Sequence, residues 1–475
     1  MKKPSILLIT ADELRKDVLS CYGSQVIKTT HLDALNDNGI RFERGYCASP
    51  WCLPSRCSIL TGLFPSHSGA YSNFRKCELN GDIPNIFSVL RENGYKTALS
   101  GKCHFAPVPY GKTKPNETQP YNEFRDYYLS LGIDDLFLQD GKEVSGWFYD
   151  DYAGEIDKIG FLDTYRRVKA DLENQKVYLF PEKADLHPDA WAGRKMRDYI
   201  NYLGEDDSAM LWLSFSGPHY PFDAPKEYYD RVDMAALEDE KINICEGEFE
   251  HPTRIHHKSY NGGGGIDGCH TAPDRGCKNY TSEYWTRLRR SYYANVALID
   301  DMVGEVVNAA KAKFGDDVAV IFTADHGEML GNHGVWGKNN CAYEDVWNVP
   351  LIVKYPNSNG GSVCDDKVML TDIFATCMSV AGVEGIKTDG EDLRTVMENG
   401  GRDYVFAEGE GYLSVSDGRY KYIHIKKPNE EFYEFFDLET DPHEYENKIN
   451  APECKDAIIR LKGEAVTHFM NIILP

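Results

Sequence analysis

The chain runs Ile6-Leu7-Leu8-Ile9-Thr10 near its start, and the acidic residues Asp12 and Glu13 follow almost at once. An apolar run without polar alternation is typical of a strand that is buried on both faces, as in the sheets of α/β proteins. A secretory leader needs an apolar core of about 7–15 residues, so this shorter run predicts a first strand and a cytoplasmic protein.

Three later apolar runs resemble the first one, at residues 96–100, 210–215 and 318–323. Side chains suited to chemistry follow them within a few residues: Lys102 and His104, then His219, then Asp325 and His326. In α/β sheets, ligands bind beyond the carboxyl ends of the strands. We therefore expect these side chains and Asp12 to form one site from segments that are far apart in the sequence.

Helices alternate with these strands. The best-supported helix precedes residue 318 and carries apolar side chains on one face at 3.6-residue spacing: Val296, Ile299, Val303, Val306, Val307 and Ala310. This alternation predicts an α/β domain over residues 1–395, built on a large mixed, mostly parallel sheet that is flanked by helices.

The character of the chain changes from about residue 396. Short runs with the turn signals of an antiparallel sheet lie at residues 404–407, 412–415, 420–425 and 434–438. A helix is expected near residues 454–470. We therefore predict a small C-terminal α+β subdomain over residues 396–475, made of an antiparallel sheet with a helix.

Composition narrows the possible functions. The 475 residues carry a formal net charge of −23, whereas nucleic-acid binding proteins present a basic face, so no nucleic-acid partner is expected. No apolar run reaches the length of about 18 residues that a membrane span requires. The 13 cysteines, an odd number, argue against a disulfide scaffold.

The stretch from about residue 240 to 284 is irregular and has four glycines in a row at residues 262–265. A connection of this length is typical of a functional loop, and we expect it to select the substrate, with Arg254, His257 and Tyr260 as candidates. A zinc site is left open there, although the spacing of its candidate ligands matches no standard site: Cys245, Cys269, Cys277, His251, His256, His257 and His270.

The most informative segment reads Ser49-Pro50-Trp51-Cys52-Leu53-Pro54-Ser55-Arg56-Cys57-Ser58-Ile59-Leu60-Thr61-Gly62. Cys52 precedes a helix that Pro54 is expected to open, and helix N-termini stabilise anions. Because Arg56 is also near, we expect a lowered thiol pKa, which makes Cys52 a candidate nucleophile. From this segment alone, the alternative to a nucleophile is that Cys52 is a loop cysteine without a catalytic role.

Cys52-Leu53-Pro54-Ser55-Arg56, continued by Thr61-Gly62, resembles the signature of the type I sulfatases. Their second signature resembles Gly94-Tyr95-Lys96-Thr97 together with Gly101-Lys102-Cys103-His104. Further likenesses, spread over nearly the whole chain, are Pro218-His219 with Pro221-Phe222, Asp325-His326-Gly327, Gly337-Lys338 and residues 436–442. The resemblance implies an alkaline-phosphatase-like fold.

The resemblance also implies a mechanism. A maturase would oxidise Cys52 to formylglycine, and one oxygen of the hydrated aldehyde, held by a metal ion and Arg56, would attack the sulfur of a sulfate ester. His219 would protonate the departing alcohol, and His104 would assist proton transfer at the diol or hold the sulfate. The second hydroxyl would then lose its proton and expel sulfate, a route that an ordinary serine or cysteine lacks.

A sulfate ester is anionic, so its oxygens must be neutralised before attack. The resemblance implies a divalent metal ion, with Ca²⁺ expected first and Mn²⁺ or Mg²⁺ as alternatives. Its implied ligands are Asp12, Glu13, residue 52 (Cys52 in the sequence), Asp325 and His326. The sulfate group itself is expected to be bound by Lys102, Lys338 and Asn73.

We therefore expect a sulfatase that acts on a sulfated carbohydrate or on an aryl or alkyl sulfate. The nearest alternative is a phosphonate monoester or phosphodiester hydrolase on the same scaffold, against which the pair Lys102 and His104 counts. Two others are a zinc phosphatase or mutase with an unmodified nucleophile, and a binding protein that keeps the fold without the activity.

Overall fold

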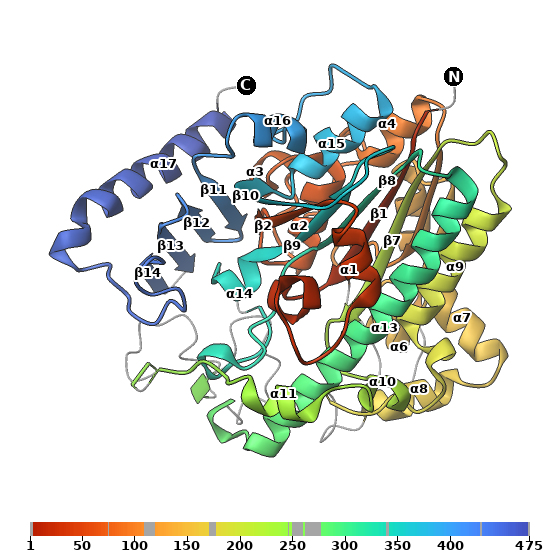
Figure 1. Cartoon of the computed structure of the whole chain (residues 1–475), viewed down its shortest axis with the longest axis horizontal. Helices are drawn as coiled ribbons and strands as arrows, with labels where there is room; N and C mark the ends of the chain where they lie inside the picture. The colour runs from red at the N-terminus through yellow and green to blue at the C-terminus, as the bar shows by residue number, and fades with distance from the viewer. Residues whose placement is uncertain are drawn as a thin grey trace.

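The computed structural model describes residues 3–74, 76–108, 119–170, 177–245, 247–248, 260–261, 277–338, 342–427 and 430–473 (Figure 1). Its centre is an eight-stranded sheet in the order β10-β2-β9-β8-β1-β7-β3-β5. The strands are β1 (Ser5–Asp12), β2 (Ile40–Tyr46), β3 (Lys96–Gly101), β5 (Asp135–Leu138), β7 (Ala209–Pro218), β8 (Val318–Ala324), β9 (Asn348–Lys354) and β10 (Ser362–Met369).

The four runs that the sequence singled out are β1, β3, β7 and β8. They are neighbours in the sheet, and they pair in parallel. Their carboxyl ends therefore lie at one edge, as predicted. β9 runs antiparallel to both β2 and β8, which makes the sheet mixed. The predicted fold class is thus confirmed.

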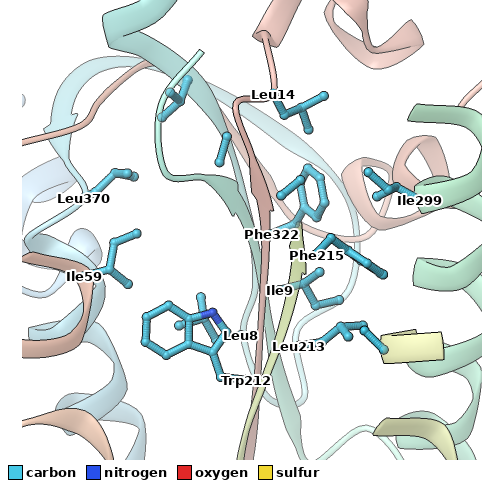
Figure 2. Close-up of a cluster of buried hydrophobic side chains, with 14 of the residues drawn as sticks. Leu8, Ile9, Leu14, Ile59, Trp212, Leu213, Phe215, Ile299, Phe322 and Leu370 are labelled. Atoms are coloured by element: carbon cyan, nitrogen blue, oxygen red, sulfur yellow. The ribbon is translucent and has the colours of Figure 1, made fainter. Parts of the chain in front are cut away.

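Helices cover both faces of this sheet. Successive side chains of a strand point to opposite faces, and β1 and β7 are apolar at successive positions, so both faces need to be buried. Figure 2 shows Trp212 of β7 on the same side as Ile59, and its neighbour Leu213 on the opposite side with Ile299. Ile59 belongs to α2 (Cys52–Thr61), and Ile299 belongs to the long α13 (Ser282–Phe314). The predicted helix around residue 300 is confirmed.

The remaining helices pack around this core or cover its ends. They are α1 (Thr30–Asn36), α3 (Pro65–Ser68), α4 (Ile86–Glu92), α5 (Asn122–Ser130), α6 (Val144–Trp147), α7 (Asp151–Lys158), α8 (Leu162–Ala170), α9 (Pro188–Tyr202), α10 (Lys226–Tyr229), α11 (Met234–Asp239), α14 (Glu344–Trp347), α15 (Asp372–Ala381) and α16 (Leu393–Glu398). A two-stranded sheet joins β4 (Gln119–Pro120) to β6 (Phe148–Tyr149).

The C-terminal segment forms the predicted small antiparallel sheet. Its strands, in spatial order, are β11 (Val405–Gly409), β12 (Tyr412–Ser416), β13 (Tyr420–Lys427) and β14 (Glu430–Asp437). One face adds side chains to the main core, and the other packs under α17 (Lys455–Ile473) (Figure 1). The domain boundary at residue 396 stays a prediction.

The irregular stretch near residues 240–284 falls largely outside the described residues, and so do Arg254 and His257, both substrate-loop candidates. Most candidate ligands of the zinc site lie outside them as well; of the two that are described, Cys245 is exposed and Cys277 is buried. No helix among the described residues has the length and apolar character needed to cross a membrane.

Candidate active site

The carboxyl ends of four neighbouring strands bring the predicted residues together. Asp12 is the last residue of β1, and Asp325 follows β8 directly. The backbone N–H of His219, just past β7, donates to the Asp12 carbonyl at 3.1 Å. Lys102 follows β3, and its N–H donates to the carbonyl of Ser214 at 2.8 Å. The site is thus fixed by the sheet itself and not by mobile side chains alone.

Cys52 is the first residue of α2, so the helix begins two residues before the proline that was expected to open it. Its Sγ atom lies 3.1 Å from Nε2 of His326. Asp12, Cys52, Asp325 and His326 are all buried, and each offers a ligand atom within 4.8 Å of the others. Four of the five implied metal ligands therefore form one cluster.

The expectation of a lowered thiol pKa at Cys52 is wrong. Burial, followed by the negative charge of Asp12, raises the pKa of this thiol to about 12, and the opposing effect of Lys102 is smaller. A thiol that stays protonated at neutral pH is a poor nucleophile. The site therefore disfavours direct attack by an unmodified Cys52 thiolate.

His326 directs the lone pair of Nε2 toward this cluster, where the Cys52 thiol is its hydrogen-bond partner. Its Nδ1 donates to the carbonyl of Gly327 at 2.9 Å, and burial lowers the pKa of the ring, so the neutral imidazole has an unprotonated Nε2. That nitrogen lies 3.6 Å from Oδ1 of Asp12 and 3.8 Å from Oδ1 of Asp325. Two carboxylates and an imidazole so oriented are a donor set that suits a divalent metal ion.

The Asp12 carboxylate supports the same conclusion. Its Oδ2 pairs with Nζ of Lys102, whereas the buried Oδ1 accepts no hydrogen bond from a described residue. A buried carboxylate oxygen without a donor is costly unless a cation is near. Cationic neighbours, Lys102 first among them, offset burial and hold the pKa of Asp12 well below its usual range. The residues present therefore fit a bound cation.

Arg56 ties α2 to two strand ends. Its Nε donates to Oδ2 of Asp325 at 2.8 Å, and both side chains are fully buried. Nη1 donates to Oγ of Ser214 at 2.6 Å and to the carbonyl of Lys102 at 3.1 Å. Nη2 is buried and makes no hydrogen bond to any described residue. One guanidinium donor is thus left for a group at residue 52 or for substrate.

His219 shares its neighbourhood with Lys338 and Glu13. Its Nε2 lies 3.1 Å from Nζ of Lys338 and 3.3 Å from Oε2 of Glu13. Its Nδ1 donates to the carbonyl of Tyr220 at 2.7 Å. Burial, with the positive charge of Lys338, lowers the pKa of this imidazole. Nε2, the nitrogen that faces the site, therefore carries the lone pair, and it must take up a proton before it can act as an acid.

Glu13 has a left-handed backbone with φ of 64°, which turns its buried side chain toward His219 and Lys338. Burial raises the pKa of this carboxyl well above its usual range, although Lys338 opposes the shift. Glu13 is not one of the four residues within 4.8 Å of one another. Its role as a metal ligand stays a prediction.

His104 is buried, whereas Asn73 is partly exposed. The backbone of His104 is left-handed, with φ of 50°. Oδ1 of Asp140 accepts the N–H of His104 at 2.8 Å and stabilises this conformation. Nδ1 of His104 is buried and has no hydrogen-bond partner among the described residues. Oδ1 of Asn73 accepts the N–H of Leu53 at 3.0 Å, so its amide caps the start of α2. Its carbonyl oxygen is therefore already engaged, and its amide nitrogen is the atom available for sulfate.

Sequence reasoning missed the polar residues that hold these groups in place. Asp189 accepts the Gly217 N–H at 2.9 Å, and Lys142 donates to the carbonyl of Pro221 at 3.2 Å and pairs with Asp223 at 2.7 Å. These contacts lie on both sides of His219 in the chain and hold its segment in place. No local pattern marks them, because each is a single polar residue in an otherwise unremarkable segment.

Comparison with known proteins identifies the family. A family model described as "Sulfatase" matches residues 4–383. The chain belongs to the sulfatase family. A second model, described as "N-sulphoglucosamine sulphohydrolase, C-terminal", matches residues 331–469 of this sulfatase. The predicted family is confirmed, and the protein is a sulfuric ester hydrolase.

Among relatives of this sulfatase, a choline-sulfatase of Rhizobium meliloti is 28% identical over 475 residues, covering 95% of this chain and 83% of the relative. An N-acetylglucosamine-6-O-sulfatase of Bacteroides thetaiotaomicron is 27% identical, covering 95% of this chain and 84% of the relative. The crystal structure of a phosphonate monoester hydrolase of Agrobacterium radiobacter superposes with a TM-score of 0.80 at 21% identity, covering 99% and 96% of the two chains. That last likeness shows the fold alone.

Proposed function

We propose that this sulfatase hydrolyses the sulfate ester of a sulfated saccharide, with Cys52 converted to formylglycine and a divalent metal ion held by Asp12, Asp325 and His326. The observation that supports this most directly is the buried cluster of Cys52 with two carboxylates and a neutral imidazole. The high pKa of the thiol points the same way, because an unmodified Cys52 gains little reactivity from its surroundings.

The metal ion, when bound, would withdraw negative charge from the sulfate oxygens and favour the ionised form of the hydrated aldehyde. Oxygen-rich ligands favour Ca²⁺, and the imidazole of His326 leaves Mn²⁺ and Mg²⁺ as alternatives. Glu13 is proposed as a further ligand from its place next to Asp12 in the chain.

The other side chains divide the remaining tasks. Nη2 of Arg56, which has no hydrogen-bond partner among the described residues, orients the hydrated residue 52. Lys102 and Lys338 neutralise the sulfate oxygens as compact cations, and the amide nitrogen of Asn73 adds a neutral donor. His219 protonates the leaving oxygen through Nε2, while His104 accepts a proton from residue 52 when sulfate is expelled.

A saccharide substrate is proposed because the relatives include an N-acetylglucosamine-6-O-sulfatase, and because the chain matches the C-terminal model of an N-sulphoglucosamine sulphohydrolase. Aryl and alkyl sulfates are the simpler members of the same ester class. A maturase that acts on Cys52 is the partner that this proposal requires.

Intact-mass measurement tests the modified residue directly. Replacement of the CH₂SH side chain by CHO lowers the mass by about 18 Da, and the loss should map to the peptide that contains Cys52. Protein that keeps the full thiol mass after co-expression with a maturase, yet turns over sulfate esters, would contradict the proposal. A zinc phosphatase or mutase with an unmodified nucleophile also predicts the full thiol mass, but with turnover of phosphate esters in place of sulfate esters.

The structural likeness to a phosphonate monoester hydrolase makes that activity the second candidate. Turnover of 4-nitrophenyl sulfate and of a 4-nitrophenyl phosphonate monoester by the same preparation distinguishes the two. We expect a higher kcat/KM for the sulfate. A strong preference for the phosphonate would assign the chain to the second activity.

A further inference from the structure

A hollow lies between the small C-terminal sheet and α17, apart from the catalytic cluster. Its volume is about 530 Å³, and it is lined by Tyr422, His424, Lys426 and Tyr433 from the sheet and by Lys462 and Phe469 from the helix, among others. Figure 1 shows α17 crossing this sheet. We call this space the C-terminal hollow. The mechanism uses none of its residues.

Aromatic rings form the sheet side of the C-terminal hollow. Tyr433 stacks on His424 with ring centroids 4.5 Å apart, and on Tyr422 with centroids 6.5 Å apart. Tyr433 is 37% exposed, so part of its ring faces the open space. A partly exposed aromatic ring can pack against the C–H face of a sugar ring, because that face is apolar and its hydrogens are weakly polar.

The charge of the C-terminal hollow is opposite to that of the whole chain. The chain has a net charge of −23, yet no described residue that lines the hollow is acidic, and two lysines line it. Lys426 lies 3.8 Å from Glu431, a carboxylate at the edge that also pairs with His424. Lys462 forms no ion pair with a described residue, and its Nζ lies 5.3 Å from the ring centroids of Tyr422 and Tyr433. An anionic ligand that carries a ring therefore fits this space.

One wall of the C-terminal hollow is hydrogen-bonded to two segments that carry site residues. Gly409 and Gly411, which flank the turn between β11 and β12, are part of its lining. In that turn the Glu410 N–H donates to the carbonyl of Tyr71 at 3.2 Å, two residues before Asn73. The Glu408 N–H donates to the carbonyl of Ala48 at 2.8 Å, four residues before Cys52. One wall of the hollow therefore packs on the two segments that carry these site residues.

The segment that precedes and follows Asn73 exposes aromatic rings. Phe74 is 56% exposed and packs edge-on against Trp51 at 5.7 Å, and Tyr71 is 39% exposed. Both rings belong to the segment that carries Asn73, and the carbonyl of Tyr71 is hydrogen-bonded to the β11–β12 turn. Exposed aromatic groups often mark sites that bind a ligand.

We propose that the C-terminal hollow binds a second sulfated sugar unit of an oligomeric or polymeric substrate, with Tyr433 as the stacking platform and Lys462 as the sulfate contact. This inference rests on the proposed function, and it names the substrate as an extended sulfated saccharide. The hollow acts in binding and takes no part in the chemistry at residue 52.

The test measures binding of a heparin-derived hexasaccharide by isothermal titration calorimetry, in a Cys52→Ala background so that no turnover interferes. Lys462→Gln and Tyr433→Ala should each weaken binding about tenfold, as expected for loss of one charge-assisted or stacking contact. Lys455→Gln, an exposed lysine on the same helix but outside the hollow, is the matched control and should bind normally. An unsulfated dextran hexasaccharide should bind weakly to all four proteins.

Turnover separates this inference from the proposed function. With Cys52 intact, Lys462→Gln should leave kcat/KM for 4-nitrophenyl sulfate within about twofold of wild type, because the hollow lies outside the catalytic centre.

Unchanged hexasaccharide affinity in both hollow variants would overturn the inference while aryl sulfate turnover still supports the proposed function. Loss of a dimer in the same variants, without any loss of hexasaccharide affinity, would assign the hollow to self-association and also overturn it. Hexasaccharide binding at the hollow without turnover of any sulfate ester would instead count against the proposed function.

Discussion

Nε2 of His326 and Sγ of Cys52 lie 3.1 Å apart, and the hydrogen bond from Nδ1 of His326 to the Gly327 carbonyl determines that Nε2 carries the lone pair. The nucleophile position and the candidate metal ligands therefore form a single buried unit. Chemical change at residue 52 and cation binding at the carboxylates should be coupled in consequence.

Substitution of Cys52 by alanine should lower aryl sulfate turnover by at least about 1,000-fold, because the variant has no group to form the covalent intermediate. The fold should persist, since Cys52 is the first residue of α2 and the strand core does not depend on its sulfur. Turnover and far-UV circular dichroism check both parts. Cys57→Ala, a buried cysteine in the same helix, should retain turnover; equal activity of the two variants would refute the assignment.

Removal of divalent metal should lower the free energy of unfolding. A metal ion present at 100 times its Kd stabilises the native state by about 2.7 kcal/mol, provided that it does not bind the unfolded chain. Thermal unfolding with and without a chelator, followed by addition of Ca²⁺, Mg²⁺ or Mn²⁺, measures this effect without any assay of activity. Asp12→Asn should lose most of the metal-dependent shift, because its free carboxylate oxygen faces the cluster. A chelator-independent melting curve in the wild type would argue against a metal site.

His219→Ala should impair substrates with poor leaving groups more than activated ones. A general acid contributes about 10²–10⁴-fold when the leaving alcohol needs a proton, and much less when it departs as a stable phenolate. Comparison of kcat/KM for a sugar sulfate and for 4-nitrophenyl sulfate measures the difference. Equal losses on both substrates would remove His219 from the role of acid.

Lys142→Met should destabilise the protein by about 3–5 kcal/mol, because it leaves the Asp223 carboxylate buried without its cation. Both side chains are fully buried and lie 2.7 Å apart. Urea unfolding checks the value. A double variant that also replaces Asp223 by leucine should recover part of the loss, since no charge is then left unpaired. As a control, Lys226→Met in the exposed pair with Asp230 should cost less than about 1 kcal/mol.

Stability should decline as pH rises through the titration of Asp300. Burial raises the pKa of this carboxyl to about 6 in the folded protein, against about 3.9 in an unfolded chain. The folded state therefore binds more protons between pH 4 and 6, and its stabilisation is fully present below that window and is lost as pH increases through it. Asp300→Asn should flatten that slope by up to about 1.4 kcal/mol per pH unit in urea unfolding measured at each pH. An unchanged slope, with the exposed variant Asp316→Asn as control, would contradict the assignment.

Much of the fold could be predicted from the local sequence. β1, β7 and β8 are apolar at most positions because both of their faces are buried, and that pattern needs no knowledge of partners. β3 is buried at all but its first residue although its sequence is more polar. β10 is different, because most of its side chains are partly or fully exposed, and its sequence lacks the same signal. The edge strands therefore remained undetected.

The side chains that follow the four strands could be predicted to lie together, because the carboxyl ends of parallel strands meet at one edge of the sheet. Cys52, Arg56 and Lys338 were instead predicted from the segment around Cys52 and from the resemblance to sulfatases. The environment of each side chain, which sets its pKa, could not be predicted from the sequence. Cys52 was expected to have a lowered pKa from a helix N-terminus and Arg56, yet burial dominates and raises it. Desolvation depends on how much of the surrounding protein excludes water, and no short segment contains that information.

By itself, the sequence of this protein determined which segments become buried strands and which side chains follow those strands at one edge of the sheet, because these follow from local hydrophobicity and chain order. Only the tertiary structure decided how those side chains are used. Arg56 pairs with Asp325, 269 residues away, and Ser214 and Asp140 support the site from segments with no motif. Such partners are selected by packing in three dimensions, where distance along the chain no longer matters.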